Sequence, residues 1–277
     1  MATGRSELLR ALAERVASAL PAEIVEEVVL TGSVSRGVAD EVSDIEMLVV
    51  TGELLELDEC FELARRAGLE ELDTWGGREG PARRVFGYRE NVPVEMVWWS
   101  RDYAAAQVGA SLAGEPSSIA DALAYGMPLR TTGLLARWKA RLSDYPPGLA
   151  AARIEDAALP WGGFAPAGVL TLIRPDDRLV LAEWLVDAAK RVLTIVFALN
   201  HVWQPTTKRL AARVAPLPVK PDRLAERIDH ALSERDPRRA LLEMTELQLD
   251  AVLLAPDGPN IDRARRWLTP AAELLRS

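Results

Sequence analysis

The spacing of apolar side chains divides the chain into a first half of mixed pattern and a second half that is almost wholly helical. Apolar residues recur every three or four positions over residues 6–20, as on a helix, and Pro21 ends this pattern. Two apolar runs then predict strands up to Val50, and residues 57–67 have the pattern of a helix that ends at Gly68. The first part of the chain is therefore expected to contain both strands and helices.

Alternating residues next predict a β-hairpin, whose strands 83–88 and 92–99 are joined at residues 89–91. Between residues 100 and 157 we expect two or three helices, including one over residues 130–142. Beyond Asp176 the pattern predicts helices over residues 178–203, 222–233, 237–254 and 261–275. The chain is thus predicted to be an α+β protein, with a mixed domain over residues 1–128 and a helical domain over residues 129–277.

Two acids stand one residue apart where the second predicted strand begins. Because successive side chains of a strand point to opposite faces, Asp44 and Glu46 project from one face and Ile45 and Met47 from the other. Two carboxylates about 4 Å apart repel by roughly 1 kcal/mol in water and about 4 kcal/mol at an effective dielectric of 20. A cation between them removes this cost, and all-oxygen ligation suits Mg²⁺.

A Gly-Ser pair precedes these acids by about ten residues. Gly32 lets the backbone come close to a ligand, and Ser33 is expected to cap a short helix whose free N–H groups face phosphate oxygens. Taken singly, a Gly-Ser turn and an Asp-x-Glu on a solvated strand are usually structural features. Their conjunction favours a site for a nucleoside triphosphate and magnesium.

These residues resemble the motif of the DNA polymerase beta-like nucleotidyltransferase superfamily, and within it the bacterial aminoglycoside and lincosamide nucleotidyltransferases. Those families carry Gly-Ser, a stretch that often contains Arg-Gly, and then Ser-Asp-apolar-acid; the matching residues are Gly32, Ser33, Arg36, Gly37, Ser43, Asp44 and Glu46. The resemblance implies a mixed β-sheet backed by helices, two Mg²⁺ ions, and contacts from Arg36 to the nucleotide. It also implies transfer of a nucleoside monophosphate to an acceptor such as an antibiotic, with release of pyrophosphate.

A third acid is expected from a neighbouring strand. Glu95 is a lone carboxylate in the apolar run 92–99, where burial without a partner would be costly, so it is expected to face a cation or an acceptor hydroxyl. The alternative is an acid on an edge strand that points to water, which Pro93 would favour. In the families that the motif resembles, this position is either a metal ligand or the general base on the attacking hydroxyl.

Lysines are rare, with four against 29 arginines, and one of them lies within the long predicted helix. Lys190 is expected to bind the triphosphate, as the resemblance supports, although Asp187 is spaced to form an ordinary surface ion pair with it. Lys208, with Arg209, is a further candidate for the nucleotide site. Trp161, in a glycine-bounded loop, is a candidate to cover a base or an acceptor.

Composition narrows the class of protein. The net charge of −8 disfavours a general nucleic-acid binder, because phosphate contacts need Lys and Arg, but it permits a local basic groove and suits a cationic acceptor. No apolar stretch approaches the roughly eighteen residues of a membrane helix, and the start lacks a secretory core. The single Cys60 suggests a buried apolar role and a reducing cytoplasm.

Several functional alternatives share this chemistry or this fold. The acceptor could be a tRNA end, as for nucleotidyltransferase toxins of toxin-antitoxin pairs, or a protein hydroxyl. The chain could also be a catalytically silent nucleotide sensor. We expect a monomer or a homodimer, and we expect His201 and His230 to be structural because neither has a companion at metal-ligand spacing.

Overall fold

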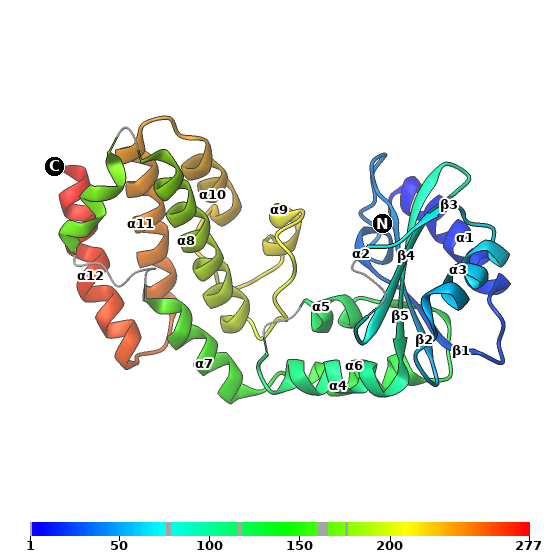
Figure 1. Cartoon of the computed structure of the whole chain (residues 1–277). Helices are drawn as coiled ribbons and strands as arrows, with labels where there is room; N and C mark the ends of the chain where they lie inside the picture. Colours follow the sequence, from blue (N-terminus) through cyan, green and yellow to red (C-terminus); the bar gives the residue numbers. More distant parts are fainter. Residues whose placement is uncertain (1, 76–78, 116–117, 160–165, 175–176) are drawn as a thin grey trace. The chain divides into compact units, whose positions relative to one another are not determined.

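The computed structural model describes residues 2–75, 79–115, 118–159, 166–174 and 177–277. The chain divides into two units, Met1–Asp144 and Tyr145–Ser277. The first is built on a mixed sheet and the second is helical, which confirms the predicted α+β class (Figure 1).

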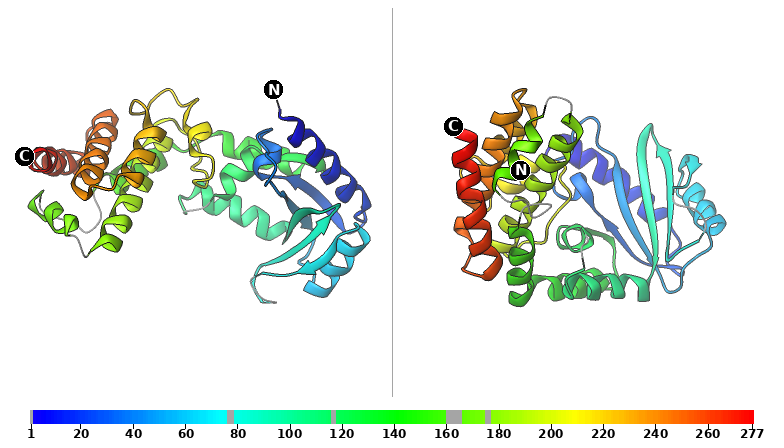
Figure 2. Two further views of the ribbon diagram at one scale, coloured as in Figure 1. Left: turned by 90° about the horizontal axis from the view of Figure 1, so that it is seen from above. Right: turned by 60° about the vertical axis from the view of Figure 1, so that its left-hand side comes forward.

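Six strands of the described chain form one sheet in the order β3-β4-β5-β2-β1-β6. They are β1 Val25–Leu30, β2 Ile45–Thr51, β3 Glu70–Asp73, β4 Ala82–Arg89, β5 Val92–Ser100 and β6 Met127–Arg130. The central strands β2 and β5 are parallel, and every other neighbouring pair is antiparallel. Figure 2 shows this sheet in two further views.

Helices lie against both faces of the sheet. The helices of this unit are α1 Gly4–Ala19, α2 Gly32–Ser35, α3 Leu57–Arg66, α4 Arg101–Leu112, α5 Ile119–Ala124 and α6 Leu134–Ser143. Ile45, Met47 and Met96 lie on the apolar face and share a buried core with residues of α1 and α3. Glu46 and Glu95 point to the opposite face, which α4 and α6 partly cover.

The predicted hairpin is confirmed. Strands β4 and β5 are joined by Glu90 and Asn91, both with positive φ, which is the backbone of the two-residue turns that match strand twist. Helix α3 ends as predicted, with φ +79° at Gly68. Cys60 is buried in α3, and burial raises the pKa of its thiol to about 12.

The sequence pattern missed one strand, and this moves the boundary between the units. Residues 127–130 form β6, so the helix expected over residues 130–142 begins only at Leu134. The first unit ends after Asp144 rather than after residue 128, since α6 packs on β1 and its first turn is bound by the buried Glu27. Over residues 100–157 the described chain forms four helices, the last of which is α7 Pro147–Ala158, where two or three were expected. One of them, α5, is only six residues long.

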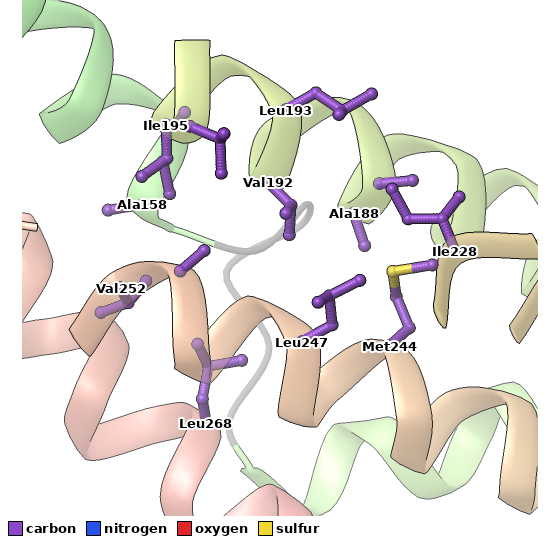
Figure 3. Close-up of a cluster of buried hydrophobic side chains, with 14 of the residues drawn as sticks. Ala158, Ala188, Val192, Leu193, Ile195, Ile228, Met244, Leu247, Val252 and Leu268 are labelled. Carbon is purple, nitrogen blue, oxygen red and sulfur yellow. The ribbon is translucent and has the colours of Figure 1, made fainter. Parts of the chain in front are cut away.

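The second unit is built around the long helix α8 Arg178–Leu199. The described helices of this unit are α7 Pro147–Ala158, the 3₁₀-helix η2 Pro166–Ile173, α8, α9 Leu210–Val214, α10 Leu224–Ser233, α11 Pro237–Leu254 and α12 Pro259–Arg276. Val192 of α8 packs with Met244 and Leu247 of α11, and Ile228 of α10 closes this core (Figure 3). No helix in the described ranges of either unit is both long and apolar enough to cross a bilayer.

Candidate active site

The Gly-Ser turn is tied to the strand that carries the second motif acid. The backbone N–H and the hydroxyl of Thr31 both donate to the carbonyl oxygen of Glu46, over 2.9 and 3.2 Å. Gly32 follows with φ +67°, and a Cβ added there would lie 1.6 Å from Oε2 of Glu46. The Glu46 carboxylate therefore lies directly against the backbone of the turn.

Helix α2 begins at this turn, but Ser33 does not cap it as expected. The N-cap residue is Thr31, and Ser33 is the second residue of the helix. The Thr31 side chain makes no cap hydrogen bond, and its hydroxyl instead donates to the Glu46 carbonyl. Ser33 is partly exposed beside Gly32, and contact of these two residues with phosphate stays a prediction.

Two sets of hydrogen bonds hold the loop between the Gly32 turn and Asp44 in place. The Ser43 hydroxyl donates to Oδ1 of Asp40 over 2.7 Å, and the Asp40 N–H donates back to that hydroxyl over 2.9 Å. The buried hydroxyl of Ser6, in the first turn of α1, accepts from the Ala39 N–H over 2.9 Å. Asp44 follows directly, one residue before β2, with a partly exposed side chain.

Glu46 and Glu95 are brought side by side by the parallel pairing of β2 and β5. Their Cα atoms are partners in the register, so both side chains leave the same face of strands about 4.8 Å apart. Asp44 stands two residues before Glu46, directly before β2, so continued strand alternation is expected to place its side chain on that face too. The edge-strand alternative for Glu95 is wrong, because β5 lies between β4 and β2.

The carboxylates of Glu46 and Glu95 have different neighbours. Glu46 reaches back over Gly32, whereas Oε1 of Glu95 lies 3.6 Å from Nη1 of Arg84 on β4. Within the described residues, no three His, Cys, Asp or Glu side chains are grouped closely enough to hold a metal ion. The donors nevertheless fit Mg²⁺, which is commonly held by one or two carboxylates together with waters and substrate phosphates. Asp44 and Glu46 can supply such a pair.

Arg36 has a structural role that the motif did not reveal. Its guanidinium donates to Oδ2 of Asp121 in α5 over 2.5 Å and to the Gly32 carbonyl over 3.2 Å, and it lies 4.7 Å from the ring centre of Tyr125. Both partners of the Arg36–Asp121 pair are mostly buried. Arg36 thus fastens the turn to α5, and direct contact with a nucleotide stays a prediction.

The other predicted nucleotide ligands belong to the second unit. Lys190 is exposed on α8, and Asp187 forms its ion pair with Arg191, over 2.6 Å. Lys208 is exposed in the segment between α8 and α9. The phosphate roles of both lysines stay predictions, and Trp161 lies outside the described residues.

Sequence reasoning did not identify Arg84, which lies beside Glu95, or Trp75, whose ring contacts Arg84. The signal for Arg84 was present in the hairpin, because a two-residue turn at Glu90 and Asn91 places Phe86 opposite Glu95 and Arg84 diagonally beside it. Trp75 had no such signal, since it follows the short strand β3.

We expect Gly32→Ala to disturb the site and to destabilise the first unit. The new Cβ meets the Glu46 carboxylate, and positive φ costs a residue with a side chain about 1 to 2 kcal/mol. Chemical denaturation measures this loss. The matched control is Gly109→Ala in α4, where a Cβ meets no atom within 4 Å and where Ala is expected to stabilise the helix by about 0.5 to 1 kcal/mol. Equal stability of the two variants would contradict the close approach at Gly32.

Comparisons with known proteins leave the family open. No protein-family model matches the chain, and no curated protein matches it. Among solved structures, it is similar to the crystal structure of a nucleotidyltransferase-like protein from Exiguobacterium sibiricum 255-15, with 13% identity and a TM-score of 0.30 over 99% of this chain and 75% of that chain. A TM-score of 0.30 is too low to establish a shared fold.

Proposed function

We propose that the protein is a metal-dependent nucleotidyltransferase. In this proposal it transfers a nucleoside monophosphate from a magnesium-bound nucleoside triphosphate to an acceptor hydroxyl and releases pyrophosphate. The observation that most strongly supports this proposal is that the Glu46 carboxylate lies against the Gly32 turn, while Glu46 pairs with Glu95 on the adjacent parallel strand. The sequence motif from Gly32 to Glu46 supports the same reading.

The roles of the residues follow their order across the sheet. In this proposal Gly32 and Ser33 contact the β- and γ-phosphates, and Asp44 and Glu46 would hold the metal ions. Glu95 lies on the side of Glu46 away from the turn, which supports its assignment to the acceptor. Lys190 and Lys208 are the candidate phosphate ligands of the second unit. Bound Mg²⁺ would neutralise charge that develops on the phosphate oxygens.

The transfer is an in-line displacement. The acceptor oxygen forms a bond to the α-phosphorus, the bond from that phosphorus to the bridging oxygen breaks, and pyrophosphate leaves with the electron pair. Glu95 takes the proton of the acceptor hydroxyl. The Arg36–Asp121 pair keeps the Gly32 turn in place while the phosphates bind and leave.

The test is to follow the label from each α-³²P-labelled nucleoside triphosphate in the presence of aminoglycosides, lincosamides or total tRNA. Label on any acceptor, together with released pyrophosphate, supports the proposal and names the acceptor. Nucleotide binding without pyrophosphate release would identify a silent sensor and would reject the enzymatic proposal.

Magnesium and a nucleoside triphosphate together are expected to raise the melting temperature. Ligand present at about 100 times its dissociation constant stabilises the folded state by about 2.7 kcal/mol, which is several degrees for a unit of this size. A dye-based melt with each nucleotide measures the shift, and addition of EDTA should remove most of it. A shift that survives EDTA unchanged would contradict metal-dependent binding.

A further inference from the structure

The strand order of the sheet arranges the candidate site residues of the first unit in a row. The Gly32 turn follows β1, Glu46 is on β2 and Glu95 is on β5. Arg84 comes next on β4, and Trp75 lies just beyond the end of β3. If the triphosphate lies at the Gly32 end of this row, the group that attacks it approaches Glu95 from the side of Arg84 and Trp75.

Arg84 and Trp75 form a defined pair on that side. The Arg84 guanidinium carbon lies 5.6 Å from the ring centre of Trp75, within the range of a cation–π contact, and Nη1 lies 3.6 Å from Glu95. The Thr74 hydroxyl donates to the Arg84 carbonyl over 2.7 Å and so fixes the chain just before Trp75 to β4. Arg84 therefore links an exposed aromatic ring to the carboxylate that we assign to the acceptor.

Both side chains are open to solvent. The Trp75 residue is 70% exposed, although burial of a tryptophan is strongly favourable, and 44% of the Arg84 side chain is exposed. An indole ring in this position offers a flat apolar surface to the ring of a sugar or base. A guanidinium has five N–H donors in a planar fork, which matches the oxygens of a phosphate.

We propose that Arg84 and Trp75 form the acceptor subsite and that it takes a phosphorylated sugar, either free or at the end of an RNA chain. This inference rests on the proposed nucleotidyl transfer. Arg84 binds the phosphate of the acceptor, and Trp75 stacks on its sugar ring. The sugar hydroxyl is then presented to Glu95. A polycationic acceptor such as an aminoglycoside has no phosphate for Arg84 to bind, so we expect this subsite to favour the sugar phosphate over it.

The experiment measures binding directly, by isothermal titration of the full chain with three probes. They are ribose 5-phosphate, a 5′-phosphorylated RNA trinucleotide and kanamycin. The variants are Arg84→Gln, Arg84→Lys, Trp75→Ala and Trp75→Phe. The control is Arg66→Gln, which removes an exposed arginine paired with Glu62 on α3, the helix that covers the opposite face of the sheet.

We expect at least one phosphate probe to bind the wild type, and its dissociation constant to rise about tenfold or more in Arg84→Gln and Trp75→Ala. Arg84→Lys and Trp75→Phe should lose less, and Arg66→Gln should match the wild type. The tighter of the two phosphate probes distinguishes a free sugar phosphate from an RNA end. Tighter binding of kanamycin, no binding of either phosphate probe, or unchanged binding in both Arg84→Gln and Trp75→Ala would overturn the subsite.

Release of pyrophosphate from the triphosphate, measured separately on the same proteins, separates this inference from the proposed function. If Arg84→Gln and Trp75→Ala bind the phosphate probes as tightly as the wild type, and the wild type still releases pyrophosphate, only the subsite is rejected. Absence of pyrophosphate release with every acceptor rejects the transferase, whatever the probes bind.

Discussion

Asp44→Asn is expected to lower the rate of nucleotidyl transfer by about 100-fold or more. The substitution keeps the shape of the side chain and removes one of two carboxylate charges at the start of β2. Removal of a group that holds charge in the transition state commonly costs a factor of this size. Release of pyrophosphate at saturating triphosphate and magnesium, with the acceptor identified by labelling, measures the loss.

Glu41→Gln is the matched control, because Glu41 is an exposed acid in the same loop, three residues before Asp44. It changes the net charge by the same amount and should retain nearly the full rate. Retention of a tenth of the wild-type rate in Asp44→Asn would reject the assignment of this carboxylate to the metal. Circular dichroism of both variants establishes that the fold is intact.

Glu27→Ala is expected to have the largest effect on stability, a loss of about 2 to 4 kcal/mol in the free energy of unfolding. Glu27 is fully buried in β1, and its carboxylate accepts hydrogen bonds from the backbone N–H groups of Thr132, Leu134 and Leu135, over 2.9 to 3.3 Å. These groups lie at the start of α6, where helix N–H groups have no partner within the helix. Alanine would remove the acceptor from all three, and the N–H groups of the buried Leu134 and Leu135 would be left unpaired.

The neighbouring Glu26 provides the control for this prediction. Glu26 forms a partly exposed ion pair with Arg101 over 3.2 Å, and such pairs contribute less than about 1 kcal/mol. Chemical denaturation of Glu26→Ala and Glu27→Ala should therefore give clearly different midpoints. Similar losses in the two variants would show that the Glu27 carboxylate does not hold the start of α6.

Local patterns predicted much of this fold because the decisive signals lie close together in sequence. The break at Pro21, the end of α3 before Gly68 and the hairpin between β4 and β5 all depend on a few adjacent residues. The hairpin turn even fixes which residues face Glu95. Helix α11 has the predicted bounds because Asp236 caps it directly before Pro237.

Features that depend on distant pairing could not be predicted in this way. Strand β6 is only four residues long and is recognisable as a strand only through its pairing with β1. The alignment of Glu46 with Glu95 requires β2 and β5 to be parallel, and the residues between them carry no signal for that register. The cap function of Glu27 likewise joins groups that are more than 100 residues apart.

The hydrogen bond between the Ala39 N–H and the Ser6 hydroxyl couples the stability of the start of α1 to that of the motif loop. The Thr3 hydroxyl reinforces it by donating to the Ala39 carbonyl over 2.9 Å, so the first helical turn and this loop share their hydrogen bonds. Fraying of that turn would release the loop just upstream of Asp44. Local unfolding of the first turn of α1 is therefore expected to increase the mobility of Asp44, although the two lie more than 30 residues apart in the sequence.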